Sequence, residues 1–216
     1  MRVFVTGSSG VLGRAVLPLL EAAGHHVRAP DHRELDLFDA RSVKEALLEI
    51  EGGYHLATRI PRQERRGDPN AWRENDRLRA DAARILVDAA LAAGTEVYVQ
   101  PSVTFVYPAD GEVDEDTPLR DVPPHLESSL AAEREAARFA QAGRRGVVLR
   151  LGRLDGPGTE YAEPEPGASA TLHVDDAGLA LLAALEAPSG IYNVVRDGGR
   201  VSNERFKQAT GWRPAL

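Results

Sequence analysis

The fold of this chain is decided near its start, by the stretch Val3-Phe4-Val5-Thr6-Gly7-Ser8-Ser9-Gly10-Val11-Leu12-Gly13. Val3–Val5 predicts a short buried β-strand, and the apolar segment from Ala15 to Gly24 predicts a helix in spite of Pro18. In such a strand–turn–helix unit the first glycine allows a tight turn, the second lets a pyrophosphate approach the backbone, and the third lets the helix pack on the strand. Free N–H groups and the helix dipole then hold phosphates. We therefore expect a dinucleotide site here, the alternative being a purely structural glycine turn.

An acidic residue follows the next predicted strand, His26–Ala29. Asp31 lies where a carboxylate would bind both ribose hydroxyls of NAD and would repel the 2′-phosphate of NADP. Arg33 could bind that phosphate instead, or could be a solvated loop cation. The pattern favours NAD and leaves NADP open.

Strands and helices alternate along the rest of the chain. Further strands are predicted at 53–57, 96–100, 147–151 and 191–195, and helices at 39–50, 69–93, 126–142, within 173–185 and at 202–209. This order implies parallel strands joined by right-handed crossovers. The predicted fold class is α/β: a Rossmann-like, doubly wound, mainly parallel sheet with helices on both faces. We expect residues 1–216 to form a single domain.

Composition excludes several classes of function. The 216 residues include 26 basic and 33 acidic ones, and a net charge of −7 argues against nucleic acid or an anionic membrane as the main partner. Without cysteine there are no disulfides, thiolate nucleophiles or cysteine-ligated metals. We see no signal peptide and no apolar run long enough to cross a bilayer, so we expect a cytoplasmic protein.

Several motifs resemble one family. Thr6-Gly7-x-x-Gly10-x-x-Gly13 is similar to the TGxxGxxG loop of extended short-chain dehydrogenases/reductases, the NAD-dependent epimerase/dehydratase family. Further resemblances cover nearly the whole chain: Asp36-Leu37 (the adenine pair), His55-Leu56-Ala57-Thr58 (HLAA), Asn75 (a helix asparagine), Val106-Tyr107-Pro108 (VYG), Gly156-Pro157-Gly158 (YGPG), His173-Val174-Asp175-Asp176 (HVDD), Ile191-Tyr192-Asn193-Val194 (YNV) and Gly211-Trp212-Arg213-Pro214 (GWRP).

The resemblance implies a set of cofactor contacts and a reduced C-terminal substrate lobe at about 155–172 and 188–216. The contact residues, with the acid and its neighbour included, are Gly7, Ser9, Gly10, Val11, Leu12, Gly13, Asp31, Arg33, Asp36, Leu37, Leu56, Ala57, Thr58, Asn75 and Ser102. It also implies a homodimer through helices 69–93 and 126–142. The charged residues Glu133 to Arg138 on the second helix leave a monomer as the alternative.

The family's catalytic Ser/Thr, Tyr and Lys are replaced in this chain. Their positions correspond to Val103, His125 and Ser129, and there is no lysine between Lys44 and Lys207. The usual proton relay therefore cannot exist. His125 could act as the acid/base, since an imidazole has a pKa of about 6.5; alternatively it is a solvated residue at a helix start. Thr104 or Tyr107 could supply a hydroxyl, although packing is the favoured interpretation of Tyr107.

Two charged groups have alternative interpretations. His173 with Asp175 and Asp176 contains metal-ligand types, but the resemblance makes this a strand-to-helix junction and we expect no metal site. The arginines at 59, 62, 65 and 66 could recruit an anionic substrate or form a solvated loop.

Three functions follow from these observations. The first is an NAD(P)-dependent oxidoreductase or epimerase/dehydratase that acts on a small carbonyl or hydroxyl compound with a non-standard proton donor. The second is a catalytically inactive NAD(P)-binding sensor or scaffold. The third is non-redox chemistry in the same pocket. The resemblance favours an enzyme, although fold alone does not fix function.

Overall fold

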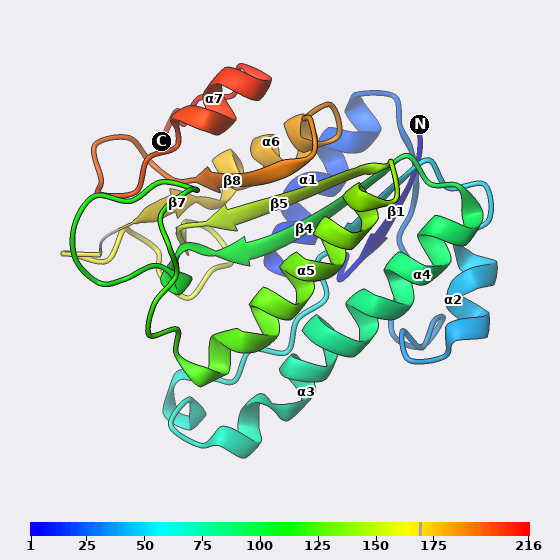
Figure 1. Cartoon of the computed structure of the whole chain (residues 1–216), viewed down its shortest axis with the longest axis horizontal. Helices are drawn as coiled ribbons and strands as arrows, with labels where there is room; N and C mark the ends of the chain where they lie inside the picture. Colours follow the sequence, from blue (N-terminus) through cyan, green and yellow to red (C-terminus); the bar gives the residue numbers. More distant parts are fainter. Residues whose placement is uncertain (169) are drawn as a thin grey trace.

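A computed structural model describes residues 1–168 and 170–216, and within them the main sheet has six parallel strands (Figure 1). Their order across the sheet is β2-β1-β3-β4-β5-β8. The strands are β1 (Arg2–Thr6), β2 (His26–Arg28), β3 (Gly52–His55), β4 (Val97–Val103), β5 (Arg145–Leu151) and β8 (Gly190–Val194). This is the Rossmann-like α/β fold that the alternation predicts.

The strand order reverses at β1. The chain leaves β1 through α1 (Val11–Ala22) to reach β2 on one side, and returns through α2 (Ala40–Ala46) to β3 on the other side. Beyond the carboxyl ends of β1 and β3 the chain therefore diverges, and open α/β sheets bind their ligands at such a switch point. The glycine loop, at the end of β1, lies at this place.

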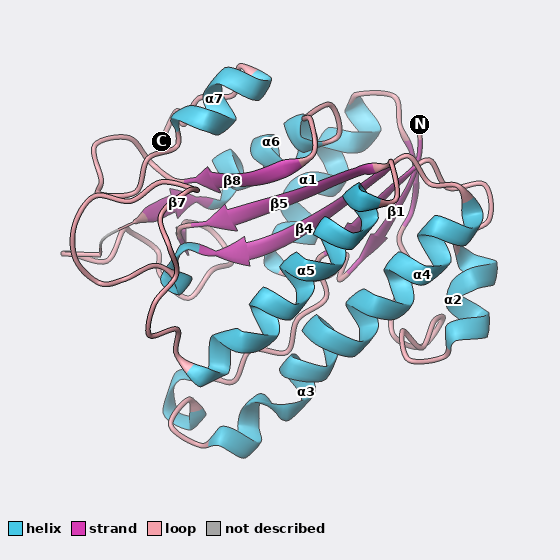
Figure 2. Ribbon diagram, in the orientation of Figure 1, coloured by secondary structure: helices cyan, strands magenta, loops and turns pink. Residues whose placement is uncertain are grey.

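Helices cover both faces of the sheet (Figure 2). Val3 and Val5 pack with α1 and α6 (Val174–Ala184), whereas Phe4 packs with α2, α4 (Ala83–Ala93) and α5 (Glu127–Gln141). Side chains alternate between the faces along a strand. A strand that is buried on both faces must be apolar at every position, which explains the uninterrupted run at 3–5.

The helix predicted at 69–93 forms, but with an irregular first half. It begins as a 3₁₀ turn (Pro69–Trp72), continues through α3 (Arg73–Arg77), widens into a π-turn at Leu78–Ala82, and continues as α4. The Asp68 side chain accepts a hydrogen bond from the Asn70 N–H at 2.9 Å, as expected of an N-cap. Gly94, with a φ of +76°, ends the helix.

Some predicted boundaries are wrong. The helix predicted at 39–50 ends at Ala46, because Leu47 caps it and Glu49 adopts a left-handed φ of +65°. Strand β4 runs three residues beyond the predicted end, since it pairs with β5 as far as Val103. Thr104 then begins a 3₁₀ turn. The direction of its side chain therefore does not follow the alternation of side chains along β4, which ends at Val103.

The C-terminal part adds a small second sheet and a satellite core. β6 (Arg153–Asp155) pairs with β7 (Thr171–His173), and α7 (Glu204–Thr210) follows β8. Tyr107, Val113 and Val201 are among the residues of this satellite core. In the part of the chain that is described, no helix is both long and apolar enough to span a membrane.

Candidate functional site

The glycine loop has the geometry of an anion cradle. Gly7 has a φ of +70°, and a Cβ there would lie 2.6 Å from the Ala57 backbone nitrogen at the end of β3. A Cβ on Gly13 would lie 2.4 Å from the carbonyl oxygens of Gly7 and Ser8. At Gly10 a Cβ would meet only the Gly7 carbonyl oxygen, at 3.1 Å, so this residue faces open space. Gly7 and Gly13 thus allow backbone segments to pack closely, and Gly10 leaves room for a ligand.

The N-terminus of α1 has unused hydrogen-bond donors. The helix starts at Val11, Gly10 provides no side-chain cap, and the first helical bond runs from Arg14 N–H to the Gly10 carbonyl at 3.0 Å. The N–H groups of Val11, Leu12 and Gly13 therefore have no acceptor among the described residues. Ser9 adds rigidity here, because its carbonyl accepts a 2.5 Å hydrogen bond from Arg14 Nη1. Such a helix start favours a phosphate.

A buried histidine ties the glycine loop to the neighbouring elements. His55 is 2% exposed; its Nδ1 lies 2.9 Å from Thr6 Oγ1 and its Nε2 lies 2.8 Å from the Leu78 carbonyl oxygen. Burial lowers the His55 pKa to about 4, so the ring is neutral at pH 7. Nε2–H therefore donates to Leu78, and Nδ1 accepts from the Thr6 hydroxyl, whose oxygen accepts from the Ala57 N–H at 3.3 Å. The chain of bonds fixes β1, β3 and the π-turn relative to one another.

Asp31 is exposed and uses only one of its two carboxylate oxygens. Oδ1 accepts hydrogen bonds from the N–H groups of Arg33 at 2.7 Å and Glu34 at 3.2 Å, and Glu34 accepts in return from the Asp31 N–H at 2.9 Å. The bond from the Arg33 backbone is the main cause of a lowered Asp31 pKa, so the group is ionised at neutral pH. Oδ2 has no acceptor or donor partner within residues 1–168 and 170–216, and is available to ribose hydroxyls.

Of the remaining residues predicted to contact the cofactor, some lie in exposed loops and others are part of the core. Asp36 accepts from the Phe38 N–H at 2.9 Å, and Leu37 packs partly against the α2 side of the core. Leu56 is buried, Ala57 half-buried and Thr58 exposed just beyond β3.

Asn75 is fully buried on α3. Its Oδ1 accepts from the Arg59 N–H at 3.1 Å, while its Nδ2 has no partner among the described residues. An unpaired buried amide costs free energy, which a ligand acceptor would recover.

Ser102 is used inside the protein. It is 4% exposed, and its hydroxyl donates to Glu133 Oε1 at 2.6 Å. Glu133 also forms a two-point ion pair with Arg150, through Nε at 3.0 Å and Nη2 at 2.7 Å. The predicted cofactor contact at Ser102 thus lies in a buried polar network, and its hydroxyl proton is already donated.

Tyr107 belongs to the same network. Its hydroxyl accepts from Arg150 Nη1 at 2.9 Å and donates to Asn193 Oδ1 at 2.9 Å. Burial raises the Tyr107 pKa despite the adjacent guanidinium. The Tyr107 hydroxyl is thus used inside the protein, which supports its interpretation as a packing residue. Thr104, in contrast, is buried with no hydrogen-bond partner for Oγ1 within the described chain.

His125 lies in a 3₁₀ turn, Pro124–Leu126, directly before α5. Its ring packs on Trp72 with 4.9 Å between ring centroids. Partial burial, and then the positive charge of Arg79, lower the His125 pKa. At pH 7 the imidazole is therefore mostly neutral, which disfavours it as a proton donor.

The position expected of the catalytic lysine holds a serine that contacts an arginine. Ser129 is 2% exposed and accepts a hydrogen bond from Arg79 Nη1 at 2.6 Å. The chain's two lysines lie elsewhere: Lys44 on α2 is exposed, and Lys207 on α7 is paired with Asp197 and Glu204. Sequence reasoning missed Arg79, because a single arginine in a helical pattern has no distinctive spacing. It named His55 only as part of the HLAA resemblance and gave the histidine no role of its own.

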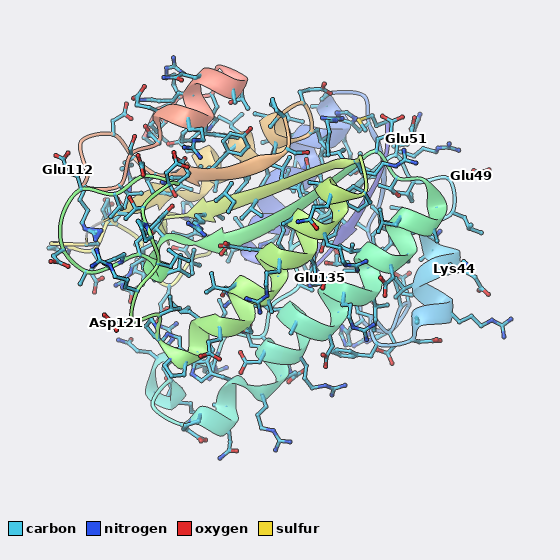
Figure 3. The ribbon with its side chains drawn as sticks, in the orientation of Figure 1. Lys44, Glu49, Glu51, Glu112, Asp121 and Glu135 are labelled. Carbon is cyan, nitrogen blue, oxygen red and sulfur yellow. The ribbon has the colours of Figure 1, made fainter. Side chains whose placement is uncertain are left out.

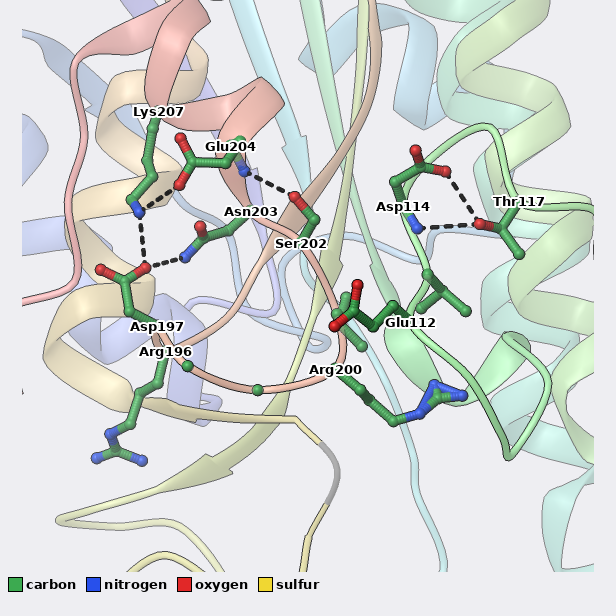
Figure 4. A pocket seen from close by; sticks show the side chains of 14 residues that line it. Glu112, Asp114, Thr117, Arg196, Asp197, Arg200, Ser202, Asn203, Glu204 and Lys207 are labelled. Atoms are coloured by element: carbon green, nitrogen blue, oxygen red, sulfur yellow. Dashed lines mark hydrogen bonds and ion pairs between the residues drawn. The ribbon is translucent and has the colours of Figure 1, made fainter.

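A cavity of about 580 Å³ opens on the C-terminal lobe, between residues 112–117 and 196–207 (Figure 4). Three of its charged side chains pair with one another: Lys207 Nζ lies 2.7 Å from Asp197 Oδ1 and 2.8 Å from Glu204 Oε1. The cavity shares no lining residue with the glycine loop.

The arginine-rich loop and the HVDD segment have local roles. Arg66 pairs with Glu160 at 2.6 Å, Arg65 with Asp68 at 3.4 Å, and Arg59 with Glu74 at 3.5 Å. His173 caps α6 by accepting from the Asp175 N–H at 3.2 Å, so the expected strand-to-helix junction is confirmed.

The sheet, its switch point and the glycine cradle define a dinucleotide-binding protein of the Rossmann type. A sequence model of the NAD dependent epimerase/dehydratase family matches residues 3–171, and the chain belongs to this family. The chain is 35% identical to a 3-diazoavenalumate denitrifying reductase of a Streptomyces species, over 91% of this chain and 76% of the relative.

Two further comparisons agree. The chain is 27% identical to a dTDP-4-dehydrorhamnose reductase of Streptomyces griseus, over 94% of this chain and 73% of the relative. It is also similar to the crystal structure of MoeE5 in complex with UDP-glucuronic acid and NAD, with a TM-score of 0.78, 27% identity, and coverage of 99% of this chain and 84% of that one. The prediction of an extended short-chain dehydrogenase/reductase is confirmed.

Proposed function

We propose that this chain is an NAD-dependent reductase that directs hydride to a small electrophilic substrate without a Tyr–Lys proton relay. The observation that carries the proposal is the cradle formed by open Gly10 and the three unpartnered N–H groups of Val11, Leu12 and Gly13, at the switch point of the sheet. These donors match a pyrophosphate in charge and hydrogen bonding.

The remaining contacts favour NAD over NADP. The second oxygen of Asp31 would accept from the two ribose hydroxyls, and its ionised carboxylate would repel a 2′-phosphate. Asp36 and Leu37 would lie beside the adenine. Leu56, Ala57 and Thr58 would line the site where β3 ends, and the unpaired Asn75 amide would donate to a ligand there. When bound, NADH supplies a hydride, and the protein's task is to orient it.

The residues around the reacting centre provide poor proton donors. Four of the five tyrosines donate or share their hydroxyls in internal hydrogen bonds, and no tyrosine–lysine contact exists within the described residues. His125 has a lowered pKa and is mostly neutral at pH 7. Reduction of a carbonyl needs a proton as well as a hydride. The site is therefore better suited to a substrate that takes hydride alone.

A diazo group meets this requirement. The name of the Streptomyces relative describes reduction of a diazo compound with loss of nitrogen. In such a reaction the carbon–nitrogen bond breaks, its electron pair leaves with N₂, and a carbon–hydrogen bond forms with the hydride pair. The protein supplies no proton. We therefore propose an aryl diazonium or a similarly activated compound as the substrate class, with carbonyl reduction through His125 as the competing activity.

The test compares two substrates of similar shape. Purified protein with NADH, deuterated at its transferable position, is given para-carboxybenzenediazonium or para-carboxybenzaldehyde. We expect NADH oxidation and N₂ release with the diazonium, deuterium at the vacated ring carbon, and the same rate in the His125→Phe variant. Reactions without protein measure the spontaneous background.

Other outcomes assign other functions. Reduction of the aldehyde that is lost in His125→Phe would make this a carbonyl reductase with histidine as its acid. Tight NADH binding with neither substrate turned over would support the sensor or scaffold, which the reductase relatives do not favour.

A further inference from the structure

Arg79 is a buried cation without a counter-ion. Only 9% of its surface is exposed, and its single side-chain hydrogen bond is donated by Nη1 to the uncharged Ser129 hydroxyl at 2.6 Å. No carboxylate forms an ion pair with it among residues 1–168 and 170–216. The nearest acidic influence is Asp76, whose Oδ1 instead accepts from Ser128 at 2.7 Å.

This arrangement is unfavourable in the free protein. A guanidinium has five N–H donors, and four of those on Arg79 have no protein acceptor in the described structure. Partial burial of an unpaired charge is unfavourable, and it lowers the Arg79 pKa. The Nε and Nη2 atoms of Arg79 are not among the fully buried atoms without a partner, so these donors are within reach of a ligand from solution. By comparison, the other deeply buried arginine, Arg150, is paired with Glu133 at 2.7 Å.

Arg79 is linked to the glycine loop through the π-turn and His55. It lies on the π-turn Leu78–Ala82, whose first carbonyl is held by His55, the residue that also holds Thr6 at the start of the glycine loop. The charge of Arg79 acts on His125 as well as on His55. π-turns inside helices are frequent at functional sites.

We propose that Arg79 binds a carboxylate or a similar oxyanion of the substrate. The guanidinium plane offers two parallel donors, the geometry that suits a carboxylate. An anion there would neutralise the buried charge and fix the substrate relative to the glycine loop. This inference rests on the proposed reductase function and names a specificity residue within that site. The phosphates of the cofactor have their own donors at the start of α1.

The test uses two probes of the same shape, one negatively charged and one uncharged. Benzoate and benzamide are titrated calorimetrically into the NADH-loaded protein, for wild type and for Arg79→Met, Arg79→Lys and Arg84→Met. Arg84 is the matched control, an exposed arginine of the same helix that pairs with Asp88 at 3.5 Å. We expect wild type and Arg84→Met to bind benzoate at least tenfold more tightly than benzamide. Arg79→Met should lose this preference, and Arg79→Lys should keep part of it.

A thermal scan distinguishes ligand binding from structural support. Since methionine removes an unpaired buried charge, we expect Arg79→Met without benzoate to unfold at a temperature no lower than wild type. Benzoate should raise the unfolding temperature of wild type and of Arg84→Met, and should leave that of Arg79→Met unchanged. The proposal is overturned if benzoate preference survives in Arg79→Met, if benzoate binds no better than benzamide to wild type, or if Arg79→Met is markedly less stable.

The affinity for NADH, measured by titration, distinguishes a failure of the Arg79 proposal from a failure of the proposed reductase function. Normal NADH binding without a benzoate preference would remove only the role of Arg79. Weakened NADH binding in Arg79→Met would assign the cation to the cofactor instead. Absence of NADH binding in wild type would remove the reductase function itself.

Discussion

At the residue scale, the glycines of the loop differ in what an added methyl group would meet. At Gly13 it would lie 2.4 Å from two carbonyl oxygens, and backbone cannot move aside cheaply. At Gly10 the only neighbour is the Gly7 carbonyl oxygen at 3.1 Å. We expect Gly13→Ala to lose about 2 kcal/mol or more of unfolding free energy. Gly10→Ala should keep its stability and bind NADH at least tenfold more weakly. Denaturant unfolding and NADH titration measure the two effects.

Gly67→Ala is the control for that pair, because a Cβ there has no neighbour within 4 Å and the residue has no left-handed φ. It should match wild type in both measurements. Equal NADH affinity in Gly10→Ala and wild type would contradict the assignment of the cradle.

His55 makes stability depend on pH. Its pKa is about 4 in the folded protein and about 6.5 when unfolded, so between these values the unfolded chain binds more protons. Its contribution is complete above pH 6.5 and is lost as pH falls through 4. The difference in pKa corresponds to about 3 kcal/mol. We expect the unfolding free energy, measured with urea, to fall over this range.

Replacing His55 by an uncharged residue should make the unfolding free energy depend less on pH. His55→Asn is expected to be less stable at pH 7 and to change less between pH 6.5 and 4. His32→Gln, at an exposed histidine, serves as the control and should keep the wild-type slope. An unchanged slope in His55→Asn would mean that other groups cause the pH dependence.

At the element scale, α5 is joined to the sheet by a buried polar network. Glu133 on α5 binds Arg150 on β5 and Ser102 on β4. Removing one partner of a buried pair leaves an unpaired charge, so Glu133→Gln and Arg150→Met should each cost about 3 kcal/mol or more. The double variant should cost less than the sum. A double-mutant cycle with chemical denaturation measures this coupling, and additive losses would contradict it.

The elements themselves were largely predictable, and their polar contacts were not. Regular periodicity predicted the strands of the main sheet and the helices to within a few residues, but it missed the short strands β6 and β7. The π-turn at Leu78–Ala82 has no sequence signature, since it depends on how the helix meets β3 and α5. Ser102 matched a cofactor position by resemblance, but its neighbours Glu133 and Arg150 come from distant segments and direct its hydroxyl inward. The glycine spacing, in contrast, describes a local structure and could be interpreted from sequence alone.

At the scale of the whole molecule, the outer surface of α4 and α5 carries ion pairs. Asp88 on α4 pairs with Arg138 on α5 at 2.7 Å, and Arg138 also pairs with Glu135 at 2.7 Å. The exposed large hydrophobic side chains, Leu48, Ile60, Phe105, Leu179 and Leu216, lie outside these two helices. A dimer through this face would have to desolvate the ion pairs.

We therefore expect sedimentation velocity to give the mass of one chain over a wide range of concentrations. Arg138→Glu should leave that mass unchanged. A dimer that dissociates in this variant would instead establish the interface that the family resemblance implies.

The scarcity of lysine has a practical consequence for attaching probes. Lys207 is 9% exposed in its side chain and its ammonium is held by Asp197 and Glu204, whose hydrogen bonds raise its pKa. Lys44 is exposed on α2 and points outward at the right of the view in Figure 3, and it forms no ion pair with the described residues. Among lysine side chains, an amine-reactive dye or surface linker should therefore modify Lys44 alone. With the N-terminal amine blocked, the molecule would be tethered in one orientation, through α2.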